Sequence, residues 1–123
     1  MAEGPLVSIV DDDQSVRESL PDLLKVFGFE ARAFSSAEEF LASDCIDKSR
    51  GLILDVALPG MCGPELQEEL KRRGLKIPIV FITAQADAVL RERVTANGAI
   101  ACLFKPFSDT ALLQALNVAM QIP

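Results

Sequence analysis

The sequence predicts a single α/β domain over residues 1–123, with five parallel strands that alternate with five helices. Short apolar runs recur along the chain, separated by stretches in which apolar residues have helical spacing. Polar residues stand directly after these runs, as expected where buried parallel strands end. Half of the residues are apolar, which is enough for one core that covers both faces of a sheet. We therefore expect a doubly wound sheet with right-handed crossovers.

The first strand is expected at residues 6–10, a mostly apolar run that stops at three consecutive aspartates, 11–13. Over residues 15–27 the apolar positions recur at helical spacing, and Gly28 suits the C-terminal cap of that helix. Pro21 lies inside this pattern, where it removes one backbone hydrogen bond. We therefore expect a kink there, or a helix that is less stable than its pattern suggests.

The second strand is expected at residues 30–34, where apolar and polar residues alternate weakly. Ser35 or Ser36 then caps a short helix whose first turn holds two glutamates, which the helix dipole favours. Residues 43–50 are polar and are expected to form an irregular connection to the next strand.

The third strand, residues 51–55, is the centre of the predicted sheet and ends at the carboxylate of Asp55. Pro59 and Gly60 keep the following segment from becoming a helix. A helix over residues 64–73 then begins with proline and ends with two arginines and a glycine, which are matching start and stop signals.

The fourth strand is expected at residues 78–82, a continuously apolar run typical of a strand buried on both faces. A helix of modest amphipathicity follows over residues 87–96 and is closed by an Asn-Gly pair. The fifth strand is expected at residues 100–104, and Ser108 caps the last helix.

Functional side chains stand at the carboxyl ends of these strands. In a parallel sheet those ends meet at one edge, and ligands bind where the strand order reverses. With the order 2-1-3-4-5, Asp55 is central, Asp11 and Asp12 lie on one side of it, and Thr83 and Lys105 lie on the other. Each residue alone has an ordinary explanation as a cap, a turn or a surface charge, but their joint placement favours a site.

The crowded carboxylates favour a hard divalent cation, Mg²⁺ or Mn²⁺, because they repel one another without one. We expect Asp12 and Asp55 as direct ligands, Asp11 as a ligand through water, and the Ala57 carbonyl as the backbone ligand. A carboxylate beside such a cation can accept a phosphoryl group. Asp55 is the expected acceptor and Lys105 the cation that neutralises the phosphoryl oxygens.

Thr83 is expected to donate its hydroxyl to a phosphoryl oxygen. Three cysteines (Cys45, Cys62 and Cys102) at scattered spacings, with no histidine, offer no plausible zinc site and are expected to be free thiols.

Composition excludes several function classes. The net charge is −6 and the chain has no run of lysine or arginine, so we expect no direct contact of this domain with nucleic acid. It has no leader-like segment and no run approaching the length of a membrane span, so we expect a cytoplasmic protein.

The motifs together resemble the CheY-like receiver domain of two-component response regulators, over essentially the whole chain, residues 1–123. The residues that carry the resemblance are Val10-Asp11-Asp12-Asp13, Leu54-Asp55, Leu58-Pro59-Gly60-Met61, Gly63, Ile82-Thr83-Ala84, Gly98-Ala99 and Lys105-Pro106-Phe107. The stretch Ser36-Ala37-Glu38-Glu39-Phe40 is most similar to the FixJ-like subgroup. The resemblance implies a flavodoxin-like fold with five parallel strands in the order 2-1-3-4-5, which agrees with the doubly wound sheet predicted above.

The resemblance implies a phospho-acceptor switch rather than an enzyme acting on free substrates. A sensor histidine kinase would supply the phosphoryl group, and the domain itself would catalyse its capture and slow hydrolysis. It further implies a cis Lys105-Pro106 bond, a C-terminal DNA-binding output domain that is absent from this chain, transcriptional control, and a phosphorylation-dependent homodimer. One departure is Cys102, which stands where receivers usually have an aromatic switch residue.

The main alternative is a haloacid-dehalogenase-like phosphatase, which also uses a strand-end aspartate, Mg²⁺, a hydroxyl and a lysine. The chain lacks its cap insertion and later acidic motif, and the central acid lies on the third strand rather than the first. A flavodoxin-like FMN binder is disfavoured because the loop after the first strand is acidic where it should hold phosphate. A pseudo-receiver that never takes phosphate is disfavoured by the complete acidic set.

Overall fold

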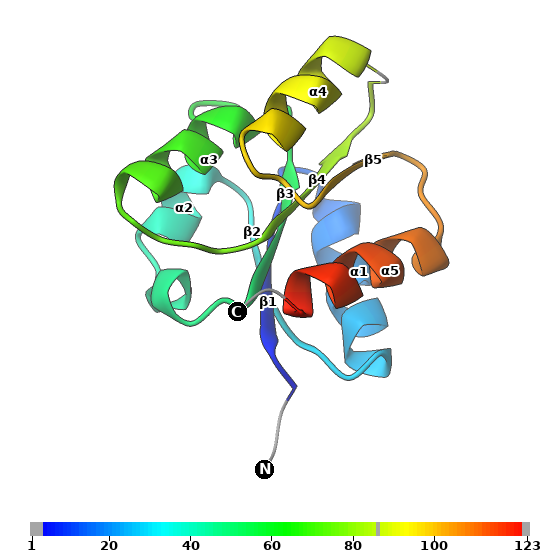
Figure 1. Cartoon of the computed structure of the whole chain (residues 1–123). Helices are drawn as coiled ribbons and strands as arrows, with labels where there is room; N and C mark the ends of the chain where they lie inside the picture. Colours follow the sequence, from blue (N-terminus) through cyan, green and yellow to red (C-terminus); the bar gives the residue numbers. More distant parts are fainter. Residues whose placement is uncertain (1–3, 86, 122–123) are drawn as a thin grey trace.

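The computed structural model describes residues 4–85 and 87–121, and a parallel sheet lies at its centre (Figure 1). Within these residues the sheet has five strands in the order β2-β1-β3-β4-β5, so the predicted architecture and strand order are confirmed. The strands are β1 (Leu6–Val10), β2 (Glu30–Phe34), β3 (Gly51–Asp55), β4 (Ile79–Thr83) and β5 (Ala101–Phe104).

Helices cover both faces of the sheet (Figure 1). They are α1 (Gln14–Val26), α2 (Ala37–Leu41), α3 (Gly63–Arg72), α4 (Ala88–Ala96) and α5 (Asp109–Met120). Leucines of α1 and α5 pack with one set of strand side chains, whereas apolar residues of α2, α3 and α4 pack with the other. All five residues of β3 are buried, because this central strand is covered from both sides. Asp55, its last residue, is therefore anchored by a fully buried strand.

The structure differs from the prediction in the connection before β3 and at the start of β4, and other element ends shift by one residue, as at β5, which begins at Ala101 instead of residue 100. The expected polar connection contains a short 3₁₀-helix, Asp44–Asp47, and buries Cys45; the Ser43 hydroxyl accepts the Cys45 N–H at 3.2 Å and so starts this turn. Pro78 precedes β4 instead of opening it, because proline has no N–H for the ladder, although its carbonyl accepts the Leu52 N–H at 3.0 Å.

No helix among the described residues is both long and apolar enough to cross a membrane.

Pro21 lies inside α1, which continues through it from Gln14 to Val26. Replacing Pro21 with alanine is expected to raise the free energy of unfolding by about 1–3 kcal/mol, because alanine restores the backbone donor and removes the ring's clash with the preceding turn. Urea denaturation measures the difference. Glu18→Ala on the same helix, an exposed control, should change stability by no more than about 0.5 kcal/mol. A Pro21→Ala chain no more stable than the parent would contradict the prediction.

Gly63 lets α3 begin directly against the end of β3. A Cβ at this position would lie 2.5 Å from the Asp55 carbonyl oxygen and 3.0 Å from the Val56 Cα, both of which are backbone atoms. Gly63→Ala is therefore expected to lower the free energy of unfolding by about 2 kcal/mol. A Cβ on Gly51 would instead meet the flexible end of Met120 at 3.0 Å, so Gly51→Ala is the matched control with a smaller loss. Equal losses in urea denaturation would show that the backbone contact is not the cause.

Candidate functional site

The carboxylates of Asp11, Asp12 and Asp55 meet at the carboxyl edge of the sheet. Asp11 directly follows β1 and is fully buried, whereas Asp55 ends β3 and is 5% exposed. One oxygen from each of the three residues lies within 4.8 Å of the other two. The structure therefore brings together the three acids that the sequence placed on neighbouring strand ends.

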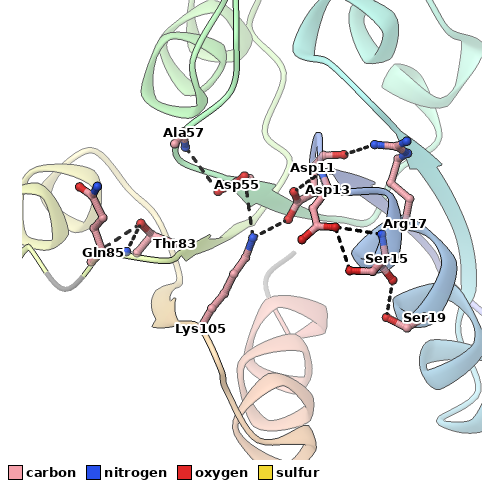
Figure 2. A network of polar contacts seen from close by, with 10 residues as sticks. All are labelled: Asp11, Asp13, Ser15, Arg17, Ser19, Asp55, Ala57, Thr83, Gln85 and Lys105. Carbon is pink, nitrogen blue, oxygen red and sulfur yellow. Dashed lines mark hydrogen bonds and ion pairs between the residues drawn. The ribbon is translucent and has the colours of Figure 1, made fainter.

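The loop after β1 is fixed by polar contacts that the sequence reasoning missed (Figure 2). Asp13 is the N-cap of α1, and its Oδ1 accepts the Ser15 N–H at 2.9 Å and the Ser15 hydroxyl at 2.8 Å. These hydrogen bonds lower the pKa of Asp13. The Asp13 N–H donates to Asp11 Oδ1 at 2.9 Å, and Arg17 Nη1 donates to the Asp11 carbonyl at 3.1 Å. An aspartate two residues before a serine at a helix start is the signal that could have revealed this cap.

Lys105 reaches the acidic site from the end of β5, but it binds mainly Asp11 (Figure 2). Its Nζ lies 2.9 Å from Asp11 Oδ2 and 3.9 Å from Asp55 Oδ2. Burial alone would lower the pKa of Lys105, but the hydrogen bond to Asp11 and the charges of Asp11 and Asp55 outweigh it and raise that pKa. The Lys105-Pro106 peptide bond is cis, as the resemblance implied.

The Asp55 carboxyl group is electrostatically strained. Its burial, and next the nearby charge of Asp11, raise its pKa from 3.8 to about 6. The charge of Lys105 and the Ala57 N–H, which donates to Asp55 Oδ1 at 3.3 Å, act in the opposite direction but are weaker. An ionised Asp55 is therefore short of positive charge.

The three acids fit a hard divalent cation such as Mg²⁺ or Mn²⁺. The cluster offers three carboxylates and no nitrogen or sulfur ligand, which is the donor set that magnesium prefers. The raised pKa of Asp55, which results from burial and the nearby charge of Asp11, favours a cation at this site independently of the ligand types. Ala57 is exposed in the loop after β3, on the same side as Asp55 Oδ1 to which its N–H donates.

Thr83 is buried at the end of β4, but its hydroxyl is engaged within its own turn (Figure 2). Thr83 Oγ1 accepts the Gln85 N–H at 3.2 Å and lies 3.4 Å from the Gln85 carbonyl. In the sheet register Ile82 pairs with Asp55, so Thr83 is one residue beyond the partner of Asp55. The predicted hydroxyl thus stands at the correct edge without contacting the Asp55 carboxylate.

Cys102 is buried on β5, and burial raises the pKa of its thiol, as expected for an ordinary core cysteine. Two residues later, Phe104 pairs with Thr83 in the sheet register. The Arg91 guanidinium of α4 lies 5.5 Å from the centre of the Phe104 ring. An aromatic side chain next to Thr83 therefore contacts α4, although it is not at position 102.

Comparisons with known proteins agree on one family of domains. A model of the response regulator receiver domain matches residues 7–117. Nodulation protein W of Bradyrhizobium diazoefficiens is 43% identical over 116 residues, which are 94% of this chain and 51% of that protein. The chain thus spans about half the length of the curated relatives it matches.

Solved structures agree with the sequence matches. The response regulator StyR has 46% sequence identity and a TM-score of 0.88, and the match covers 96% of this chain and 60% of the StyR chain. The structure called FixJ-N has 34% identity and a TM-score of 0.86, and the match covers 100% of this chain and 98% of that one.

Proposed function

Because this chain belongs to the response regulator receiver family, we propose that Asp55 accepts a phosphoryl group from a sensor histidine kinase and that the domain then changes conformation. The family membership confirms the resemblance that the sequence motifs indicated. The observation that carries the proposal for Asp55 is its position: a buried carboxylate at the end of the central strand, beside a lysine that also pairs with a fully buried acid.

The acids would hold the divalent cation that the site favours. Receiver domains bind Mg²⁺ at an acidic pocket, and in this chain Asp11, Asp12, Asp55 and the Ala57 carbonyl are the proposed ligands or water-mediated ligands. When bound, Mg²⁺ or Mn²⁺ supplies positive charge to the phosphoryl oxygens as negative charge develops on them.

In the transfer step, an Asp55 carboxylate oxygen attacks the phosphorus atom of the donor. The new O–P bond forms as the N–P bond to the kinase histidine breaks, and the imidazole nitrogen keeps the electron pair. In the later hydrolysis step a water oxygen attacks phosphorus and the O–P bond to Asp55 breaks, which releases inorganic phosphate and restores the carboxylate. Lys105 supports both steps if its Nζ turns from Asp11 toward the phosphoryl oxygens; the two acids are close enough to allow this.

The phosphoryl group would change the β4–α4 region. It adds roughly −1.5 to −2 charges at Asp55, and these attract hydroxyl and ammonium donors. Thr83 would exchange its contacts with the Gln85 backbone for one to a phosphoryl oxygen. Its register partner Phe104, which contacts Arg91, offers a route by which this movement would reach α4.

The full protein is proposed to be a transcriptional regulator. The curated relatives include transcriptional regulatory proteins about twice as long as this chain, so we propose a C-terminal DNA-binding domain as the output. The receiver itself, residues 1–123, has a net charge of −6 and would not contact nucleic acid. We also propose a phosphorylation-dependent homodimer and a cytoplasmic location.

Uptake of a phosphoryl group from a small donor tests the proposal. Incubation with acetyl phosphate and Mg²⁺ should raise the intact mass by one phosphoryl group, and peptide mapping should place it on Asp55. The match to the receiver family already favours this over the phosphatase alternative. Multiple turnover of a generic phosphomonoester, without a stable phosphorylated protein, would contradict the proposal.

A further inference from the structure

In the segment from Ser36 to Phe40, the Glu38 side chain neither caps α2 nor packs it against the sheet. The Ser36 hydroxyl accepts the Glu39 N–H at 3.0 Å, and Glu39 Oε1 accepts the Ser35 N–H at 2.7 Å, so these residues cap the start of α2. Ala37 and Phe40 are buried and hold α2 to the sheet. The Glu38 side chain takes part neither in the cap nor in this packing.

Glu38 instead reaches the loop that follows β3. Its Oε2 accepts the N–H of Met61 at 2.9 Å, although the two residues are 23 positions apart in the sequence. The same oxygen lies beside Gly60: a Cβ on this residue would be 2.7 Å from Glu38 Oε2. Gly60 has a φ of +73°, which an L side chain rarely adopts. The carboxylate is therefore seated against two consecutive backbone units.

The loop held by Glu38 also carries groups that face Asp55. Its base is closed by the Gly63 N–H, which donates to the Val56 carbonyl at 3.0 Å, and the buried side chain of Leu58 anchors its middle. At its start, the Ala57 N–H donates to Asp55 Oδ1. The hydrogen bond from Met61 ties the far side of this loop to α2, an element outside β3 and α3.

We propose that Glu38 is a positioning residue for the phosphorylation site. By holding residues 60 and 61 against α2, its carboxylate sets the path of the loop and, through it, the orientation of the Ala57 amide and carbonyl beside Asp55. The proposal rests on the function proposed above, because it assigns Glu38 a part in cation binding and phosphoryl capture at that same site.

The chemistry of the contact defines the variants that test it. Glu38 acts through an oxygen at a fixed reach, so Glu38→Gln keeps a neutral acceptor, Glu38→Asp is one methylene too short, and Glu38→Ala has no acceptor. Glu39→Ala is the matched control, because it removes a neighbouring glutamate that binds Ser35 rather than the loop. Circular dichroism verifies that all four chains are folded.

Calorimetric titration with Mg²⁺ is the first measurement, and phosphorylation by acetyl phosphate is the second. Glu38→Ala and Glu38→Asp should bind Mg²⁺ about three- to tenfold more weakly than the parent, which is the loss expected for one positioning hydrogen bond. Glu38→Gln and Glu39→Ala should stay within about twofold of the parent. In metal-free NMR spectra, the Met61 and Ala57 amide signals should move in Glu38→Ala and stay in place in Glu39→Ala.

Three results would overturn the proposal: parent-like Mg²⁺ affinity in Glu38→Ala, equal weakening in Glu39→Ala, or equal weakening in Glu38→Gln, which would assign the effect to charge. Each of these presupposes a parent chain that binds Mg²⁺ and takes up a phosphoryl group. A parent chain that does neither would instead contradict the proposed function itself, so the two failures are distinguishable.

Discussion

Replacing Asp55 with asparagine is expected to abolish phosphoryl uptake from acetyl phosphate and to make the metal-free domain more stable. The asparagine amide is no nucleophile toward phosphorus, so the intact mass should stay unchanged under conditions that modify the parent. At the same time the substitution removes a buried negative charge whose pKa is raised to about 6, mainly by burial and next by Asp11. Loss of function and gain of stability should therefore accompany one another.

The expected gain in the free energy of unfolding of Asp55→Asn depends on pH. A raised pKa in the folded state means that the ionised Asp55 costs stability above pH 6, and that this cost disappears as the pH falls through about 6 toward 3.8. With about 1.4 kcal/mol per pKa unit as the upper limit, Asp55→Asn should gain about 1–3 kcal/mol in urea denaturation at pH 7.5 with a chelator. The parent should gain stability between pH 7.5 and 5, and the variant should show less of this gain.

The matched control is Asp22→Asn, an exposed change on α1, which should alter neither phosphoryl uptake nor the pH dependence of stability. Modification of Asp55→Asn at the parent's rate would remove Asp55 from its proposed role. A destabilised variant at pH 7.5 would show that the carboxylate is well neutralised without a metal, against the electrostatics of the site. Mg²⁺ should narrow the stability difference, because it stabilises the parent by binding to the folded state.

The second large effect is expected for Lys105→Met, which removes the ammonium group and keeps a long apolar stem. Phosphoryl uptake should fall about 100-fold, the usual loss when one group that stabilises the transition-state charge is removed. The metal-free domain should also lose about 2 kcal/mol of stability, since the fully buried Asp11 is left without its 2.9 Å ion pair. Mg²⁺ affinity should increase, because a competing cation is gone.

Rapid-quench kinetics with acetyl phosphate measure the first effect, and urea denaturation with calorimetry measures the other two. Lys48→Met is the control: Lys48 pairs with Asp44 at the surface, and its loss should change stability by less than about 1 kcal/mol. Uptake within threefold of the parent would contradict the role of Lys105. Unchanged stability with reduced uptake would show that the Asp13 N–H alone satisfies Asp11.

Much of the site could be predicted because strand ends are readable in one dimension. A buried parallel strand is an apolar run, and the polar residue that stops it must lie at the shared edge of the sheet. This placed Asp11, Asp12 and Asp55 together, and the structure brings their oxygens within 4.8 Å. The same reasoning brought Thr83 and Lys105 to that edge, where both are found.

Partner choice at this edge could not be read in the same way. Lys105 lies nearer to Asp11, 94 positions away, than to Asp55, and the Thr83 hydroxyl is engaged with the Gln85 backbone. Which oxygen a flexible side chain binds depends on its rotamer and on differences in distance that are smaller than the length of a hydrogen bond. The contact of Glu38 with Met61 depends in turn on how α2 packs beside the loop after β3.

The sequence by itself determined the alternation of strands and helices, the place of Asp55 at the end of the third strand and the set of groups at one edge of the sheet, because hydrophobic periodicity and chain direction are local properties. Only the tertiary structure decided which of these groups touch, how strongly burial raises the pKa of Asp55, and that Glu38 holds the neighbouring loop. These features arise from contacts between residues far apart in the chain, and such contacts exist only once the helices have packed on the sheet.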